Sequence, residues 1–160
     1  MSTEFDRPEL PSLGIVSALE EDYRRLLSNY GEFLPVPAGD ALVEEGSAQD
    51  SLFLLISGLL HVVTDKSGSR VLLARVEPGE SVGEVNLFDP GRASASVIAK
   101  TFSQIWKANR GDLDDFRKAY PEPAGRLMMG LLSEMARRLR AMNAKLTTAG
   151  MKTALQEFFH

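Results

Sequence analysis

The spacing of apolar residues changes twice along the chain, and each of the three resulting regions predicts a different kind of structure. Residues 1–12 form a mostly polar lead. Residues 17–30 then carry apolar side chains at helical spacing, namely Leu19, Tyr23, Leu26, Leu27 and Tyr30. Ser17 and Glu20 stand three positions apart, as in a capping box, and Gly31 suits a left-handed helix end. We therefore expect an N-terminal helix over residues 17–30.

Between residues 31 and 109 the apolar residues fall into short runs. They are separated by turns rich in glycine and proline, such as Pro37–Asp40 and Glu77–Glu80. The runs are Ala41–Glu45, Ser51–Ser57, Leu59–Thr64, Val71–Val76, Ser94–Lys100 and Gln104–Ala108. Short strands joined by such turns are typical of an antiparallel β domain. The expected fold is mainly β with flanking helices: an antiparallel β-roll, or jelly-roll barrel, over residues 31–109.

The longest helical pattern follows this region. Asp112 is expected to cap a short helix, and Pro121 then introduces a long C-terminal helix over about residues 122–148, followed by a short tail at 149–160. Apolar residues of the long helix recur at alternating steps of four and three, a set that we call the seam: Met128, Leu132, Met135, Leu139, Met142 and Leu146. This spacing favours a homodimer through a parallel partner helix. An amphipathic helix lying on its own barrel explains it equally well.

Composition limits the range of functions. The chain has 160 residues, of which 44% are hydrophobic, so we expect one domain, at residues 13–148. A formal net charge of −4 provides no general basic field for nucleic acid, so no DNA partner is expected. Cysteine is absent, and the start of the chain has no apolar run that could act as a signal peptide or membrane span. We expect a cytoplasmic protein without membrane contact.

Catalytic residues and metal sites are not expected. The histidines are His61, inside an apolar strand, and His160, the last residue, and they cannot form a cluster of metal ligands. The serines lack both a Gly-x-Ser-x-Gly elbow and a histidine near a nucleophile. We therefore predict a binding protein with no enzymatic activity and no metal.

Candidate chemistry is concentrated in residues 79–97, with the sequence GESVGEVNLFDPGRASASV. Gly83 lets backbone amides approach an anion closely, and the forked guanidinium of Arg92 suits a phosphate. Glu84 is out of place beside a phosphate unless it binds a neutral group such as a sugar hydroxyl. The segment suggests a ribose-phosphate ligand, although ordinary surface loops also combine a Gly-Glu turn with an arginine.

The order of these motifs resembles the cyclic nucleotide-binding domain family. Residues 79–84, the following arginine and small residues, and Ala99–Thr101 resemble its phosphate-binding cassette. The turns and strands over residues 37–76 occur in the family's order, and Glu134–Leu139 resembles the corresponding helix of the bacterial catabolite activators. The resemblance covers about residues 13–146 and implies a β-roll closed by a C-terminal lid helix.

The resemblance also implies a ligand, cAMP or cGMP, and a set of contacts. In the family, the cassette glycine and its neighbours offer amides to the phosphate, the glutamate binds the ribose 2′-hydroxyl, and an arginine pairs with the phosphate. Small residues offer further donors, and the lid helix covers the base. Carried over, the ligand-binding residues are Gly83, Glu84, Val85, Arg92, Ala93, Ser94, Ala95, Met142 and Asn143.

Two positions depart from the family pattern. The family arginine stands nine residues after the cassette glutamate, where this chain has Ala93. Arg92 precedes it and should point outward on an extended strand, unless a bulge at residues 89–91 re-aims it. On the lid helix, Met142 stands where the activators offer a hydroxyl to adenine, while Asn143 could still bond the base edge. The identity of the nucleotide therefore stays open.

These patterns predict a stand-alone regulatory module that senses a cyclic mononucleotide and relays it through its C-terminal helix to a protein partner or second copy. The displaced arginine supports an alternative, a degenerate domain that no longer binds nucleotide and acts as a protein-interaction scaffold. A basic run on the long helix is interpreted as its solvated face, because residues 149–160 are too few for a helix-turn-helix domain: Arg137, Arg138, Arg140 and Lys145.

Overall fold

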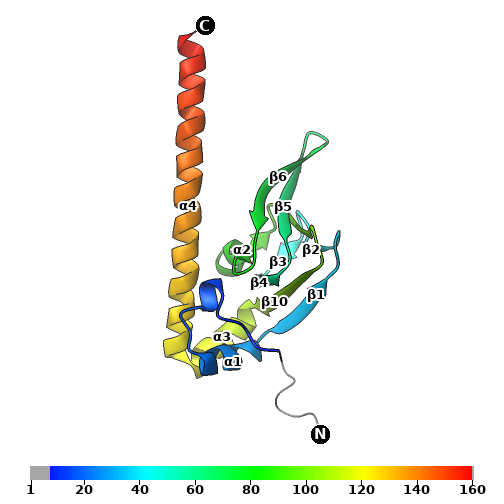
Figure 1. The fold of residues 1–160 in the computed structure, drawn as a ribbon, viewed down its shortest axis with the longest axis vertical. Coiled ribbons are helices and arrows are strands. Elements are labelled where there is room, and N and C mark those ends of the chain that lie inside the picture. Colours follow the sequence, from blue (N-terminus) through cyan, green and yellow to red (C-terminus); the bar gives the residue numbers. More distant parts are fainter. Residues whose placement is uncertain (1–7, 160) are drawn as a thin grey trace.

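The computed structural model describes residues 8–159, whose strands form a β-roll beside one long helix (Figure 1). In chain order the elements are η1 (Gly14–Val16), α1 (Glu21–Ser28), β1 (Glu32–Val36), β2 (Ala41–Val43), β3 (Ala48–Gln49), β4 (Ser51–Ser57), β5 (Leu60–Lys66), β6 (Ser69–Val76), β7 (Ser81–Val82), α2 (Glu84–Phe88), β8 (Gly91–Arg92), β9 (Ser96–Ala99), β10 (Ser103–Asn109), α3 (Arg110–Ala119) and α4 (Pro121–Phe158). Two four-stranded antiparallel sheets have the orders β1-β10-β4-β7 and β2-β9-β5-β6, and β3 pairs with β8. The predicted fold class is confirmed.

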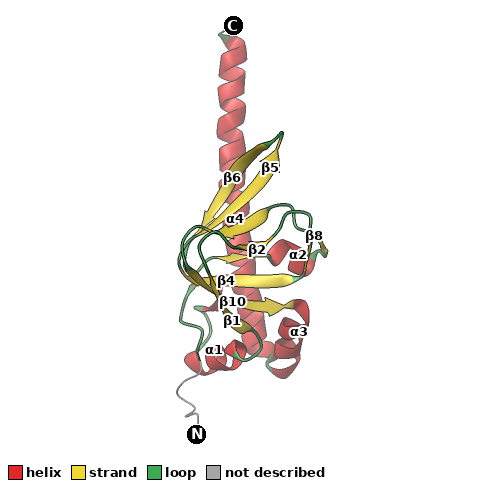
Figure 2. Ribbon diagram, turned by 90° about the vertical axis from the view of Figure 1, so that its right-hand side faces the viewer, coloured by secondary structure: helices red, strands yellow, loops and turns green. Residues whose placement is uncertain are grey.

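The hydrophobic core has two parts. Inside the roll, Leu55, Val97 and Ile105 from three different strands belong to one buried cluster. A second cluster lies between the roll and the helices and includes Trp106 of β10 and Phe116 of α3. Figure 2 shows α1 and α3 at one end of the roll, with α4 passing along the sheets. Burial on both sides of β4 explains why this strand is a nearly continuous run of apolar residues.

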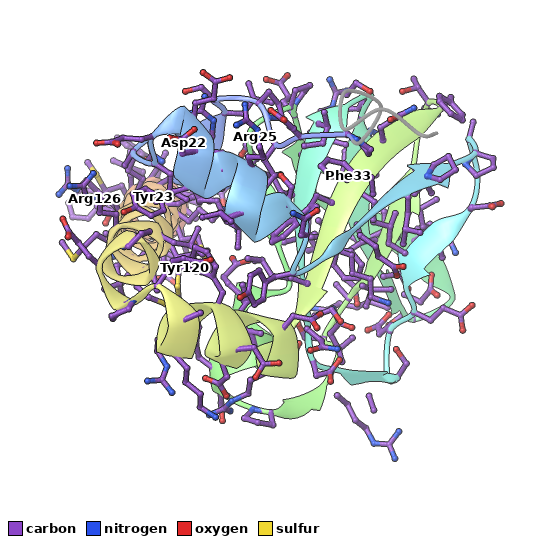
Figure 3. The ribbon with its side chains drawn as sticks, turned by 90° about the horizontal axis from the view of Figure 1, so that it is seen from below. Asp22, Tyr23, Arg25, Phe33, Tyr120 and Arg126 are labelled. Carbon is purple, nitrogen blue, oxygen red and sulfur yellow. The ribbon has the colours of Figure 1, made fainter. Side chains whose placement is uncertain are left out.

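Aromatic side chains fix the point where α4 begins. Tyr120 joins α3 to α4, and its ring centroid lies 6.3 Å from that of Tyr23 in α1 and 5.5 Å from that of Phe116. Figure 3 shows Tyr23 and Tyr120 facing each other between α1 and the first turns of α4. The base of the long helix is thereby anchored to the N-terminal helix as well as to α3.

The helix predicted over residues 17–30 begins later than expected. The Ser17 hydroxyl donates to the Gly14 carbonyl at 2.7 Å and so closes the η1 turn. α1 starts at Glu21, and Glu20 makes no side-chain capping bond. The predicted capping box of Ser17 and Glu20 is wrong, because the serine is already engaged by the preceding turn.

The residue that caps α3 is Asn109 rather than Asp112. The Asn109 side chain accepts from the Asp112 amide at 2.8 Å, and the Asp112 carboxylate accepts from the Asn109 amide at 2.9 Å. Asp112 is therefore the third helical residue of a capping box, and the prediction that it caps the helix itself is wrong.

The helix expected to end near residue 148 continues to Phe158, so most of the predicted tail is helical. The buried residues of α4 are Pro123, Ala124, Leu127, Leu131 and Glu134. Most seam residues are exposed instead: Leu132, Leu139, Met142 and Leu146. The interpretation that the seam lies on its own barrel holds only for Met128, which packs against the core, and is wrong for these four exposed residues. All residues from 139 to 159 are exposed, and none of the described helices is long and apolar enough to cross a membrane.

Candidate functional site

The candidate site begins at the turn between β7 and α2. Gly83 occupies this turn with a φ of +93°, and a Cβ atom at this position would lie 2.1 Å from the Ser51 carbonyl oxygen. A side chain therefore cannot be accommodated here. The turn directs Glu84, the first residue of α2, into the protein, where its side chain is buried.

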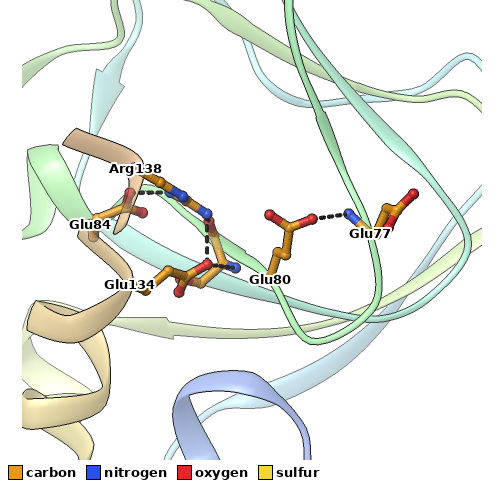
Figure 4. A network of polar contacts seen from close by, with 6 residues as sticks. Glu77, Glu80, Glu84, Glu134 and Arg138 are labelled. Atoms are coloured by element: carbon orange, nitrogen blue, oxygen red, sulfur yellow. Dashed lines mark hydrogen bonds and ion pairs between the residues drawn. The ribbon is translucent and has the colours of Figure 1, made fainter. Parts of the chain in front are cut away.

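Glu84 forms an ion pair with Arg138 of α4 (Figure 4). The Arg138 guanidinium also donates to the Ser81 carbonyl and, at 2.8 Å, to Glu134 on the preceding turn of α4. Glu134 in turn accepts from the Ser81 hydroxyl at 2.8 Å and from the Ser81 amide at 3.3 Å. These four residues, Ser81, Glu84, Glu134 and Arg138, form what we call the Arg138 cluster. It ties the β7–α2 turn to the long helix.

The Arg138 cluster contains two carboxylates but one guanidinium. Glu84 and Glu134 are only 6% and 7% exposed, so neither charge is well solvated. One oxygen of Glu84 pairs with Arg138, whereas Oε2 is buried without a hydrogen-bond partner among the described residues. Leaving a buried polar atom unpaired is unfavourable. The site is therefore suited to a ligand that brings a donor, such as a hydroxyl group, to Oε2.

Arg92 points away from the interior of the roll. It lies opposite Ala48 in the β3–β8 pair, and its exposed guanidinium donates to the Gly46 carbonyl at 2.7 Å. Ala93, at the position of the family arginine, is buried in the cluster inside the roll. Of the two orientations considered for Arg92, the structure shows the outward one. Within residues 8–159, no hydrogen bond or ion pair joins the Arg92 side chain to the Arg138 cluster.

The structure brings Gly83 and Glu84 together with α4, but it leaves the predicted lid residues apart from the cassette. Met142 and Asn143 lie about one helical turn beyond Arg138, and neither side chain has a hydrogen bond to the cassette in the described part of the chain. The other predicted ligand residues are exposed or half-buried around the turn: Val85, Ser94 and Ala95.

Sequence reasoning missed the other members of the Arg138 cluster. Arg138 stands in a basic run and was expected on a solvated helix face, an interpretation that the ion pairs overturn. The one available signal is the spacing of four between Glu134 and Arg138, which places opposite charges together on one helix face. Nothing in the sequence indicates that Ser81 and Glu84 meet the same guanidinium.

Comparison with known proteins identifies the family. Residues 33–120, more than half of the chain, match the family model described as the cyclic nucleotide-binding domain. The chain belongs to the cyclic nucleotide-binding domain family. The resemblance carried by the cassette is thereby confirmed, and the domain has the fold of a regulatory, ligand-sensing module.

Curated relatives contain this domain within longer proteins. Glutaminase 2 of Bradyrhizobium diazoefficiens is 37% identical over 108 residues, which are 68% of this chain and 17% of that protein. The Pycsar effector protein BcPycTIR of Burkholderia cepacia is 28% identical over 74% of this chain and 38% of its own length. The cAMP-activated global transcriptional regulator CRP of Salmonella typhimurium is 28% identical over 68% of this chain and 51% of its own length. The chain thus spans about half or less of these relatives.

Solved structures share the fold of the domain. The catabolite activator protein of Thermus thermophilus has a TM-score of 0.74 and 26% identity, over 85% of this chain and 62% of that one. The N-terminal domain of a transcriptional regulator from Streptomyces coelicolor has a TM-score of 0.68 and 30% identity, over 82% and 90% of the two chains. Within the described part of this cyclic nucleotide-binding domain, no group of three or more acidic or histidine side chains could hold a metal ion.

Proposed function

We propose that this domain senses a cyclic mononucleotide, cAMP or cGMP, at the turn formed by Gly83 and Glu84. The observation that carries the proposal is the Oε2 atom of Glu84, which is buried and lacks a partner among the described residues. A ribose hydroxyl can donate to this oxygen while the other oxygen keeps its ion pair with Arg138. The family match supports a nucleotide ligand, and the relative from Salmonella is described as cAMP-activated.

The remaining contacts follow from the positions around this turn. Gly83 and Val85 offer amides to the phosphate, with Ser94 and Ala95 close by. The position of the family arginine is occupied by Ala93, so this position contributes no positive charge. Met142 and Asn143 cover the base once α4 bends toward the cassette. Arg92 joins the phosphate only by leaving the Gly46 carbonyl.

Arg138 transmits the effect of ligand binding from the cassette to α4. A ligand changes the position of α4 only when it binds better to one position than to another. Because Arg138 belongs to α4 and holds Glu84, any ligand that engages Glu84 acts on a residue of this helix. The exposed seam then passes the change to a second copy, which makes the proposed assembly a homodimer, or to another protein partner.

Calorimetry with cAMP and with cGMP tests this function. Glu84→Gln keeps the shape of the side chain but removes the negative acceptor, so we expect about ten- to hundredfold weaker binding. Glu80→Gln is the matched control, because Glu80 accepts from the Glu77 amide at 2.9 Å outside the Arg138 cluster. If wild-type protein gives neither heat nor a change in melting temperature at millimolar concentrations of both nucleotides, the domain is not a cyclic nucleotide sensor.

A second function is favoured by the outward Arg92 and the buried Ala93. These residues leave the Arg138 cluster with an excess negative charge, which opposes an anionic phosphate. The domain is then a scaffold that binds a protein through α4. The variant Arg92→Ala separates the two functions. If the domain is a sensor whose Arg92 turns inward, the variant should bind the nucleotide about tenfold more weakly than wild type. If the domain is a scaffold, neither wild type nor the variant should bind nucleotide. A pull-down through α4 that recovers no partner counts against the scaffold.

A further inference from the structure

An open cavity of about 530 Å³ is lined in part by Glu134 and Arg138 of the Arg138 cluster. Three segments line this cavity, which is open to solvent: the N-terminal turn at residues 12–14, the β6–β7 turn at residues 78–80 and one face of α4. The lining residues are Ser12, Leu13, Gly14, Pro78, Gly79, Glu80, Glu134, Arg137, Arg138 and Ala141. Gly79 and Glu80 stand at the start of the cassette, but none of the residues proposed to contact the nucleotide, at positions 83–95, 142 and 143, is among them. Figure 4 shows Glu84 on one side of the Arg138–Glu134 pair and Glu80 on the other. The cavity is therefore separate from the site proposed for the nucleotide.

Two of the segments that line this cavity are in direct backbone contact. A Cβ atom on Gly14 would lie 1.6 Å from the Gly79 carbonyl oxygen, so the N-terminal turn and the β6–β7 turn touch directly. Both glycines have positive φ, +48° and +91°, which other residues rarely adopt. Ile15 and Val16, which follow Gly14, are anchored in the core. The cavity is thus built from fixed elements, and its volume is in the range of small-molecule sites.

The charged groups of the cavity are engaged, with one exception. Arg138 and Glu134 pair with each other and with Ser81, and Glu80 accepts from the Glu77 amide. Within residues 8–159, Arg137 has no hydrogen bond or ion pair. The rest of the lining is largely apolar or backbone, contributed by residues such as Leu13, Pro78 and Ala141. The cavity therefore offers an apolar surface with one free guanidinium.

We propose that this cavity is a second ligand site, for a small organic anion with an apolar body. The acidic group of the ligand pairs with Arg137, whose fork matches a carboxylate or sulfonate, and the body packs between Leu13, Pro78 and Ala141. A ligand here contacts the roll and α4 at once and touches Arg138, which holds Glu84. Occupancy of the cavity and of the cassette are then linked, and the linkage is reciprocal. The existence of the cavity site does not depend on whether the cassette binds nucleotide.

Fluorescence titration of the full chain with 1-anilinonaphthalene-8-sulfonate, an apolar aromatic anion, tests the site. Arg137→Ala removes the cation, and we expect at least about tenfold weaker binding of the probe. Ala141→Phe fills the cavity and should abolish saturable binding. Arg140→Ala is the matched control, because Arg140 is an exposed arginine of the same helix that does not line the cavity, and it should bind as wild type.

The probe can also adhere to the exposed seam, and the variants separate the two locations. Binding that is unchanged in both Arg137→Ala and Ala141→Phe, or weakened equally by Arg140→Ala, overturns the proposal. Melting temperatures show that the variants are folded. Amide shifts in a ¹⁵N spectrum of wild type provide a readout without substitution: the probe should move Gly14, Gly79 and Ala141, and shifts confined to residues 139–159 would also overturn it.

Discussion

Arg138 pairs with two buried carboxylates, so its loss should cost more than the loss of an ordinary helix arginine. Arg138→Ala leaves Glu84 and Glu134 buried without their cation. Because the Arg138 side chain is itself 33% exposed and water can enter, we expect the free energy of unfolding to fall by about 2–3 kcal/mol. Arg137→Ala, without a pair to lose in the described structure, should change it by less than about 0.5 kcal/mol. Urea denaturation at pH 7 measures both, and equal losses would contradict this role of Arg138.

The carboxyl group of Glu45 makes the stability of the β-roll depend on pH. The Thr64 hydroxyl donates to its carboxylate at 2.7 Å and the Asp65 amide at 3.1 Å, and these bonds lower the pKa of Glu45 below its ordinary value of 4.5. A pKa that is lower in the folded state contributes stability above pH 4.5, and this contribution disappears as the pH falls through the folded value. Glu45→Gln should therefore lower the melting temperature more at pH 7 than at pH 3. The neighbouring Glu44→Gln is the control, and a deficit that persists at pH 3 would argue against the carboxylate's role.

At the residue level, the sequence restricts where a side chain can point more than it identifies what the side chain contacts. Strand alternation and a bulge at residues 89–91 leave two orientations open for Arg92, and the structure decides for the outward one. Gly83 is predictable because the turn requires it. The pairing of Arg138 with Glu84 joins positions 54 residues apart, and local periodicity carries no information about such a pair. Arg138 was therefore interpreted as solvated charge, although together with Glu134 it joins the cassette to the helix.

The two faces of α4 should respond very differently to the same substitution. Leu131 is 1% exposed against the roll, whereas its neighbour Leu132 in the seam is 58% exposed. Leu131→Ala opens a cavity, and we expect it to lower the free energy of unfolding by about 2–4 kcal/mol. Leu132→Ala should cost less than about 0.5 kcal/mol in dilute protein. Denaturation of both variants at low concentration measures the difference, and similar losses would mean that the seam, too, is buried.

Element prediction from this sequence succeeds where a strand is long and apolar. The strand predicted at Ser51–Ser57 is confirmed as β4, because it is buried on both faces. β3, β7 and β8 have two residues each, too few for any periodicity to show. β1 was missed for another reason: it contains Pro35, which cannot donate to a ladder and is tolerated here because β1 forms the edge of its sheet.

In the molecule as a whole, the two halves of α4 have different surroundings. The half of α4 near Tyr120 is anchored among helices and roll, and the half beyond Arg138 is fully exposed. The Arg138 cluster stands between the two halves. A helical segment without tertiary contacts is only marginally stable in water, which supports the proposal that the exposed half packs against a partner. The proposed nucleotide site and the proposed cavity site both lie next to Arg138, where the anchored half of α4 ends.

We propose that a second copy of the chain is the partner of the seam. Its exposed residues, Leu132, Leu139, Met142 and Leu146, continue at coiled-coil spacing on a face that the roll leaves free. Leu139→Asp places like charges together in a parallel pair of helices and should shift the protein from dimer to monomer in light scattering at about 100 µM, a range where coiled coils of moderate affinity are assembled. Ala144→Asp adds the same charge at an exposed position outside the seam and should leave the dimer intact. Because neither substitution touches the buried face of α4, both variants should unfold like wild type once it has been diluted to monomer. A wild-type protein that remains monomeric at this concentration would contradict the dimer.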